Sequence, residues 1–177
     1  MKKLLIVVDM QKDFIDGTLG TKEAVEIVPG VVKRIQEYEA SGDTIIFTMD
    51  THFEDYMDTQ EGKKLPVAHC IKGTDGHKLC KEILELGIQE KCKVYEKLTF
   101  GSSEFANDMA AGKYDEYTDI ELVGLCTDIC VISNAMLVKT FLLNAEVVVD
   151  SRLCAGVTPE SHKNALEAMK MCQIMVK

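Results

Sequence analysis

The sequence is short of basic residues, has no tryptophan and has no long apolar run, and these gaps narrow the functions open to it. Its 20 Lys and Arg residues are outnumbered by 29 Asp and Glu residues, which gives a net charge of −9 at pH 7. This charge argues against nucleic acid and against an anionic membrane surface as partners, because both attract basic proteins. Small molecules are therefore the expected ligands, and the sequence leaves open whether the chain forms a homo-oligomer.

Disulfide bonds and secretion are not indicated either. The seven cysteines are odd in number and scattered along the chain, and no two of them form a Cys-x-x-Cys pair. This pattern predicts neither a disulfide framework nor a cysteine-type zinc site. The apolar run from Leu4 to Val8 is too short for the core of a signal peptide, and it ends at Asp9 without a small-residue cleavage site. We therefore expect a reducing, cytoplasmic compartment.

Apolar periodicity predicts that residues 1–177 form one domain in which strands and helices alternate. Short apolar runs predict six strands, at 3–8, 44–48, 93–95, 120–123, 146–149 and 173–176. Spacing of three and four residues predicts helices between them, at 24–38, 77–86, 104–110, 127–143 and 158–171. Pro29 is expected to kink the first helix or to reset its start. The order predicts an α/β fold, a Rossmann-like three-layer α/β/α sandwich with a six-stranded parallel sheet.

Four residues with reactive or charged side chains follow four of the predicted strands. These are Asp9, Asp50, Lys97 and Cys130. Ligands of open parallel sheets bind beyond the carboxyl ends of the strands, where these residues are expected to meet. The sequence therefore predicts a functional site at this edge of the sheet.

Cys130 is the candidate nucleophile at this edge. It falls in the first turn of the helix predicted to start near Thr127 or Asp128, either of which has a side chain that can cap a helix. The free N–H groups and the positive dipole end of a helix stabilise a thiolate, which is the reactive form of cysteine. A buried structural cysteine is the alternative interpretation of this position taken alone.

Asp9 and Lys97 supply the groups that a cysteine nucleophile needs. A carboxylate can accept the thiol proton, and an ammonium favours the anions that result. Each residue by itself is more often structural, Asp9 as a loop cap and Lys97 as a solvated lysine. Their joint position at successive strand ends, together with Cys130, favours a catalytic trio.

A second group of residues has the composition of a metal site. Asp50 and His52 are two residues apart, so on an extended chain their side chains point the same way. With His69 they would form a set of two histidines and one carboxylate, which suits a catalytic Zn²⁺ with one position open. Fe²⁺ and Mn²⁺ also accept such nitrogen and oxygen ligands. Glu61 is a further candidate ligand, and polar surface residues without a metal are the alternative interpretation.

The stretch 53–76 that contains His69 shows little periodicity. A loop of this length inside a compact domain is usually functional. The remaining two histidines of the chain, His77 and His162, are expected to be exposed helix residues without a role.

These motifs, taken in order, resemble those of the isochorismatase-like cysteine hydrolases, in particular the nicotinamidase branch. The resemblance covers nearly the whole chain. The matching segments are Val7-Val8-Asp9-Met10-Gln11-Lys12-Asp13-Phe14, Asp50-x-His52, Pro66-x-x-His69-Cys70-Ile-x-Gly-Thr-x-Gly76, Lys97 and Gly124-Leu-Cys-Thr127-Asp128-x-Cys130-Val.

The resemblance implies a role for each residue of the predicted site. It implies a triad of Asp9, Lys97 and Cys130, and a metal ion held by the three ligands named above. It also implies a cis peptide bond between Leu125 and Cys126. The backbone N–H groups of Cys126 and Cys130 would form the oxyanion hole.

The activity implied by the resemblance is the metal-assisted hydrolysis of nicotinamide to nicotinate and ammonia through a thioester. Nicotinamidases usually carry an aromatic residue near the Pro-x-His segment to stack on the pyridine ring. This chain has Leu65 and Pro66 there. Phe14 is expected to pack against the ring instead.

Two other functions stay open on this scaffold or outside it. One is an isochorismatase or another small-amide hydrolase. Isochorismate is a dicarboxylate, and two-point recognition of its carboxylates would favour an arginine fork. Arg34 lies in mid-helix, which leaves Arg152 as the candidate fork. The other is a redox or metal-binding module without enzyme activity, in which Cys126 and Cys130 form a reversible disulfide.

Overall fold

A computed structural model describes residues 2–177, and in this part of the chain six strands form one parallel sheet in the order β3-β2-β1-β4-β5-β6. Every neighbouring pair is parallel. The strands are β1 (Lys2–Val8), β2 (Thr44–Asp50), β3 (Lys93–Lys97), β4 (Tyr117–Leu125), β5 (Glu146–Ala155) and β6 (Met175–Val176). The predicted six-stranded parallel sheet is confirmed.

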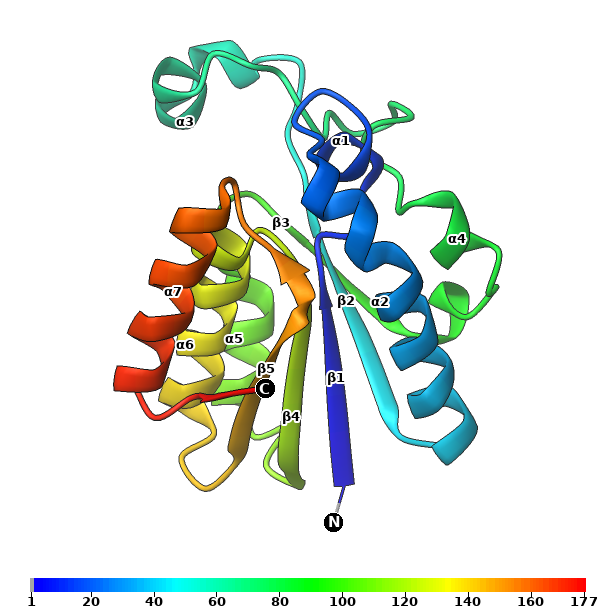
Figure 1. Cartoon of the computed structure of the whole chain (residues 1–177), viewed down its shortest axis with the longest axis vertical. Helices are drawn as coiled ribbons and strands as arrows, with labels where there is room; N and C mark the ends of the chain where they lie inside the picture. Colours follow the sequence, from blue (N-terminus) through cyan, green and yellow to red (C-terminus); the bar gives the residue numbers. More distant parts are fainter. Residues whose placement is uncertain (1) are drawn as a thin grey trace.

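Helices cover both faces of the sheet (Figure 1). On one side lie α1 (Lys12–Ile15), α2 (Lys22–Ser41) and α4 (Lys81–Leu84), and on the other α5 (Ser103–Ala110), α6 (Ile132–Phe141) and α7 (Pro159–Met171). The short helix α3 (Gln60–Lys64) stands apart, beyond the carboxyl ends of the strands. The predicted three-layer sandwich is therefore confirmed. None of the helices formed by residues 2–177 has the length and apolar character that a membrane crossing needs.

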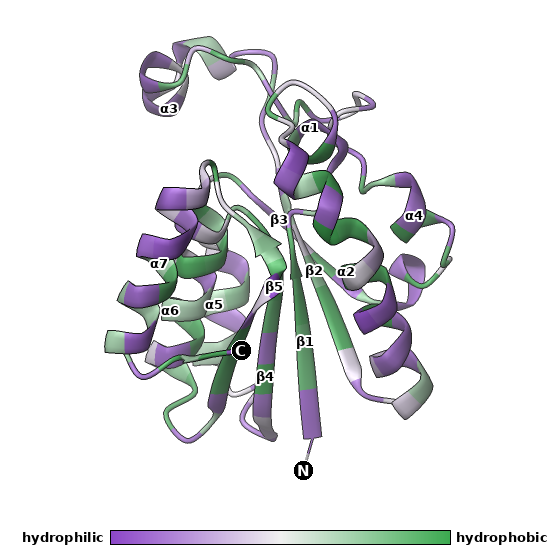
Figure 2. Ribbon diagram, in the orientation of Figure 1, coloured by the Kyte–Doolittle hydropathy of each residue, from purple (hydrophilic) through white to green (hydrophobic). Residues whose placement is uncertain are grey.

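The central strand β1 is buried on both faces, which explains its continuous apolar run. Leu4, Ile6 and Val8 pack with side chains of α5, α6 and α7, whereas Leu5 and Val7 pack with side chains of α2. Successive side chains of a strand point to opposite faces, so one strand serves both halves of the core. Each such side chain contributes about 1.5–3 kcal/mol relative to leaving it exposed. Figure 2 shows the strands as apolar through the middle of the molecule.

Three predicted helix boundaries differ from the structure. Thr21 caps α2 by accepting a hydrogen bond from the N–H of Ala24 at 3.0 Å, so the expected reset of the helix start at Pro29 is wrong. Proline removes one backbone hydrogen bond there, and the buried face of a 20-residue helix offsets that loss. The predicted helix 77–86 is wrong at both of its ends, because only Lys81–Leu84 is helical. The predicted helix 127–143 is a π-type turn, Thr127–Val131, followed by α6.

Candidate active site

The carboxyl ends of four adjacent strands bring the predicted site residues together. Asp9 directly follows β1, Asp50 and Lys97 are the last residues of β2 and β3, and Cys130 lies in the turn after β4. All four residues are buried, Asp9 completely. The order of the strands therefore explains why residues far apart in the sequence meet at one place.

The Lys97 ammonium is the centre of this group. Its Nζ lies 2.7 Å from Asp9 Oδ2 and 3.1 Å from Asp50 Oδ1, and it donates to Cys130 Sγ at 3.4 Å. A buried lysine is costly unless it is paired. Burial lowers the pKa of a lysine, but the negative groups here, Asp9 first, raise the pKa of Lys97 well above its ordinary value. Lys97 therefore stays charged and joins the predicted trio to Asp50.

Burial decides the protonation at rest of Cys130, the candidate nucleophile. It raises the pKa of the Cys130 thiol well above its ordinary value; the Asp9 carboxylate adds to this effect and the Lys97 ammonium opposes it. Burial also raises the pKa of Asp9, against Lys97 and the Thr48 hydroxyl, which donates to Asp9 Oδ1 at 2.7 Å. Cys130 is therefore a thiol at rest, because burial outweighs the stabilisation of a thiolate expected from the helix start. Asp9 is a stronger base than an exposed aspartate.

The turn that carries Cys130 is set by a close approach of β4 to β1. Gly124 has a φ of 119°, and a Cβ at this position would clash with the backbone of Val8, so glycine is required. The peptide bond between Leu125 and Cys126 is cis, as the resemblance implied. The carbonyl oxygen of Cys126 then accepts from Val131 N at 3.0 Å and closes the π-type turn. The two implied oxyanion donors, the N–H groups of Cys126 and Cys130, belong to this turn.

The residues expected to cap the helix after Cys130 have another use. Among the described residues, neither Thr127 nor Asp128 makes a capping hydrogen bond, so that expectation is wrong. Thr127 Oγ1 lies 2.8 Å from His162 Nδ1 on α7, and the Asp128 carboxylate accepts from Val157 N at 3.1 and 3.2 Å. The turn is thereby tied to α7 and to the loop before it.

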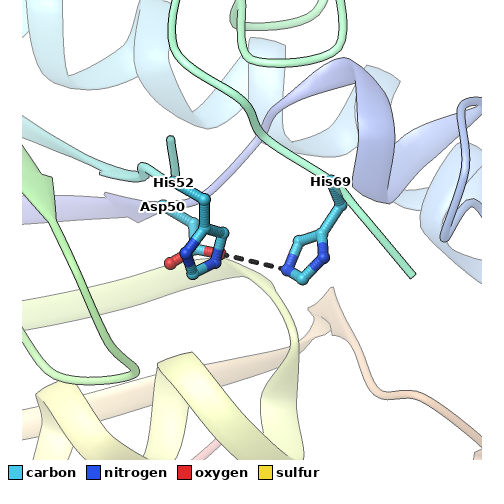
Figure 3. A group of neighbouring side chains, drawn as sticks. All are labelled: Asp50, His52 and His69. Atoms are coloured by element: carbon cyan, nitrogen blue, oxygen red, sulfur yellow. Dashed lines mark hydrogen bonds and ion pairs between the residues drawn. The ribbon is translucent and has the colours of Figure 1, made fainter. Parts of the chain in front are cut away.

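Asp50, His52 and His69 form a compact cluster of possible metal ligands (Figure 3). One ligand atom from each lies within 4.8 Å of the others, and all three residues are buried. Asp50 Oδ2 lies 3.0 Å from His52 Nε2 and 3.4 Å from His69 Nε2. His69 Nδ1 donates to the carbonyl oxygen of Val67 at 2.8 Å, which leaves the lone pair of the neutral ring on Nε2, facing the cluster. The donor set and its orientation fit a divalent transition metal.

Asp50 is ionised in this cluster. Burial alone would raise the pKa of Asp50, but the neighbouring His52 and His69 rings, His52 first, together with the charge of Lys97, hold that pKa well below its ordinary value. An ionised carboxylate is the form that binds a metal ion.

Glu61, the further candidate ligand, lies at the edge of the cluster. Its Oε1 is 3.7 Å from His52 Nε2 and 4.0 Å from His69 Nε2. Tyr56 attaches the segment that carries Glu61 to the cluster, since the Tyr56 ring centroid lies 4.6 Å from that of His52 and 5.1 Å from that of His69. The Tyr56 hydroxyl also donates to the carbonyl oxygen of Leu65 at 2.9 Å and so closes the segment that contains α3. Tyr56 had no marked signal in the sequence.

A cavity of about 250 Å³ opens onto Cys130, Asp50 and His69. Phe14 and Leu65, the two predicted pocket residues, both line it. Sequence reasoning missed several of its other walls, which are Leu19, Thr21, Ala24, Phe100, Ile129 and Val157. The position of Ile129 next to the candidate nucleophile Cys130 was a signal for that residue, whereas Val157 reaches the cavity only because the loop before α7 folds back.

The expectation that His77 and His162 are exposed helix residues is wrong. His77 is buried in a turn, with Nε2 2.9 Å from Thr51 Oγ1. Burial lowers the pKa of His77. His162 does lie on a helix but is half-buried against Thr127. Neither belongs to the group of possible metal ligands.

The comparisons with known proteins agree with this geometry. The model of the isochorismatase domain matches residues 3–177. An uncharacterized isochorismatase family protein of Bacillus subtilis, PncA, is 31% identical over 173 residues, which cover 94% of this chain and 93% of that protein. The crystal structure of nicotinamidase PncA from Bacillus subtilis covers 99% of both chains with a TM-score of 0.83 at 28% identity. Pyrazinamidase of Pyrococcus horikoshii in complex with zinc covers 100% of this chain and 99% of its own, with a TM-score of 0.80 at 25% identity. The chain belongs to the isochorismatase family.

Proposed function

We propose that this protein hydrolyses nicotinamide to nicotinate and ammonia, with Cys130 as nucleophile. The chain is a hydrolase of the class that cleaves carbon–nitrogen amide bonds. The observation that carries the proposal is the single buried ammonium of Lys97, which contacts Asp9, Cys130 and Asp50 beside the cavity. The relatives described as nicotinamidases and pyrazinamidases support the same substrate class.

The reaction takes two steps at Cys130. Asp9 accepts the thiol proton while Sγ attacks the amide carbon, and the N–H groups of Cys126 and Cys130 stabilise the oxyanion. The tetrahedral intermediate collapses to a thioester, and ammonia leaves with the proton that Asp9 returns. Asp9 then takes a proton from water, the hydroxyl attacks the thioester carbon, and the bond between carbon and Sγ breaks. Asp9 returns its proton to Sγ, which restores the Cys130 thiol, and the nicotinic acid formed leaves and ionises to nicotinate. Lys97 balances the negative charge throughout.

The shape and polarity of the cavity favour a small neutral ring. Its volume of about 250 Å³ and its apolar walls, among them Phe14 and Ile129, suit a pyridine amide. Arg152 does not line this cavity, and its guanidinium instead donates to Asp150 at 2.7 and 2.9 Å. Arg34 is paired with Glu121. Both arginines that could bind a dicarboxylate are therefore paired with carboxylates of the chain itself.

A divalent metal, Zn²⁺ before Fe²⁺ or Mn²⁺, is part of this proposal. Asp50, His52 and His69 would hold it, and Glu61 lies close enough to join them. When bound, the ion supplies a Lewis-acidic position for the ring nitrogen of the substrate. The relative from Pyrococcus horikoshii, described in complex with zinc, supports the choice of metal.

The test is a side-by-side measurement of kcat/KM on nicotinamide and on isochorismate with the purified full chain. Ammonia release reports the first reaction. We expect nicotinamide to be hydrolysed far faster, and Cys130→Ala protein to serve as the blank. A higher value for isochorismate would overturn the proposed substrate, and no turnover of either would move the assignment to another small amide.

A further inference from the structure

We infer that Gln11 and Asp13 are positioning residues for the metal ligands, each holding the backbone at or beside one ligand without contacting a metal. The inference rests on the metal site included in the proposed function. It gives a task to two residues that follow β1 and take no part in the chemistry proposed for the trio.

The side-chain amide of Gln11 forms hydrogen bonds with both the backbone N–H and the backbone C=O of Asp50. Gln11 Nε2 donates to the carbonyl oxygen of Asp50 at 2.8 Å, and Gln11 Oε1 accepts from the N–H of Asp50 at 2.7 Å. The second Nε2 hydrogen bond, also 2.8 Å, goes to the carbonyl oxygen of His77. The Gln11 side chain is completely buried. Three of the four hydrogen bonds that an amide side chain can make are thus used in one place.

The position of Asp50 in the sheet explains this arrangement. The last residues that β1 and β2 pair are Val8 and Thr48. The next residue of β2 whose backbone groups point towards β1 is Asp50. In a parallel pair the N–H and C=O of one residue point to the same neighbour. At Asp50 that neighbour is no longer a strand but the Gln11 amide, which takes over the hydrogen bonds of β1 for one more residue. Without it, a buried N–H and a buried C=O would be left unpaired.

Asp13 holds the chain next to His69. Asp13 Oδ2 accepts from the N–H of Cys70 at 2.8 Å. Cys70 is fully buried and has a φ of 47°, a left-handed conformation that costs a non-glycine residue about 1–2 kcal/mol. A side chain at Gly76 would clash with the Asp13 carboxylate, so this carboxylate is enclosed by the backbone on two sides. The strained backbone that aims His69 into the cluster therefore depends on this acceptor.

The same short segment also contacts a ligand of the cluster directly. Phe14 follows Asp13, and its ring centroid lies 5.5 Å from that of His69. One segment after β1 therefore supports both elements that supply ligands, the end of β2 and the loop before α4. Removing partners of this kind typically weakens metal binding by 10- to 100-fold, because the ligands lose their fixed orientation.

The test measures the Kd for Zn²⁺ of the full chain by competition with a chromophoric chelator. Gln11→Met and Asp13→Ala are expected to raise the Kd by about 10- to 100-fold. Asp13→Asn keeps an oxygen that can accept from Cys70, so its Kd should stay within about 3-fold of the wild type. Asp16→Ala removes an exposed carboxylate of the same loop, and Gln89→Met removes a glutamine far from the cluster; both controls should bind as the wild type does.

The urea unfolding of each metal-free variant is measured in parallel, so that loss of fold is told apart from loss of positioning. Asp13 is only half-buried, and its variants provide the result if Gln11→Met does not fold. Unchanged Kd values in folded Gln11→Met and Asp13→Ala proteins would overturn the inference. So would a loss in Asp13→Asn equal to that in Asp13→Ala. Zn²⁺ binding without ammonia release would contradict the proposed function alone, and a wild-type chain that binds no Zn²⁺ would overturn the inference together with the metal site.

Discussion

Lys97 Nζ lies 3.1 Å from Asp50 Oδ1, and the two residues are paired neighbours at the ends of β3 and β2. The same ammonium lies 2.7 Å from Asp9 Oδ2. One cation thus separates two buried carboxylates, one assigned to proton transfer and one to the metal ion. Replacing it should affect both stability and turnover.

Lys97→Met should therefore abolish turnover and lower the free energy of unfolding by about 3–5 kcal/mol, because it leaves buried carboxylates unpaired. Urea denaturation and ammonia release measure the two effects. Lys93→Met is the matched control at the start of the same strand. Lys93 pairs with Glu104 at the surface, so its loss should cost less than about 1 kcal/mol and leave turnover intact. Near-normal turnover in the Lys97 variant would contradict the role proposed for it.

Cys130→Ala should lower turnover by a factor on the order of 10⁴ or more, with the fold retained, because it removes the proposed nucleophile. Cys126→Ala should keep a substantial fraction of activity. The oxyanion donor proposed at position 126 is a backbone N–H, which alanine also has. Initial rates of ammonia release and circular dichroism of both variants are the measurements. Equal losses from the two substitutions would speak against the assignment of Cys130.

One divalent ion per chain, most often Zn²⁺, is expected in protein purified without added metal. His52→Ala and His69→Ala should lose the ion, because each removes one of the three clustered ligands. His162→Ala, which changes a histidine outside the cluster, should retain it. Elemental analysis measures the metal content of each protein. Activity measured after treatment with a chelator shows whether the reaction needs the metal ion. A metal-free preparation with full activity would contradict the proposed role of the metal ion.

Stability should fall as the pH rises above about 9, because buried cysteines hold their protons longer than unfolded ones do. Burial raises the pKa of Cys154 to about 12 and that of Cys80 to about 11. Between pH 9 and these values the native state binds more protons than the unfolded chain, so the stability present below pH 9 is progressively lost. Each such group contributes about 1.4 kcal/mol per pH unit at most.

The check is urea unfolding from pH 7 to pH 11 on the wild type and on Cys154→Ala. The variant starts lower because of the cavity that it leaves, but its free energy of unfolding should decline less steeply with pH. Parallel declines in the two proteins would show that Cys154 does not contribute in this way.

The order of strands and helices could be predicted from the sequence because apolar periodicity is a local property. β1 reads as a continuous apolar run since both its faces are buried, and Asp9 marks its end. Asp50 and Lys97 end their strands in the same recognisable manner. The candidate trio and the three possible metal ligands could therefore be placed at one edge of the sheet before the structure was known. The roles of these residues stay predictions.

Predictions from local sequence patterns were wrong or absent for residues whose surroundings depend on a segment distant in the sequence. His77 reads as a residue of an exposed helix, yet a loop folded over the strand ends buries it against Thr51. Thr127 reads as a helix cap, yet its hydroxyl faces His162 on α7. Val157 carries no local mark of a cavity residue at all.

The sequence by itself determined which chemical groups follow which strands. Tertiary structure alone decided which of those groups share a partner, because the order β3-β2-β1-β4 places Lys97 between two carboxylates and a thiol that lie far from it along the chain. It also decided their charge states. Burial raises the pKa of Cys130, although the charge of Lys97 lowers it. The depth of a group below the surface is a property of the folded chain and is not contained in any stretch of sequence.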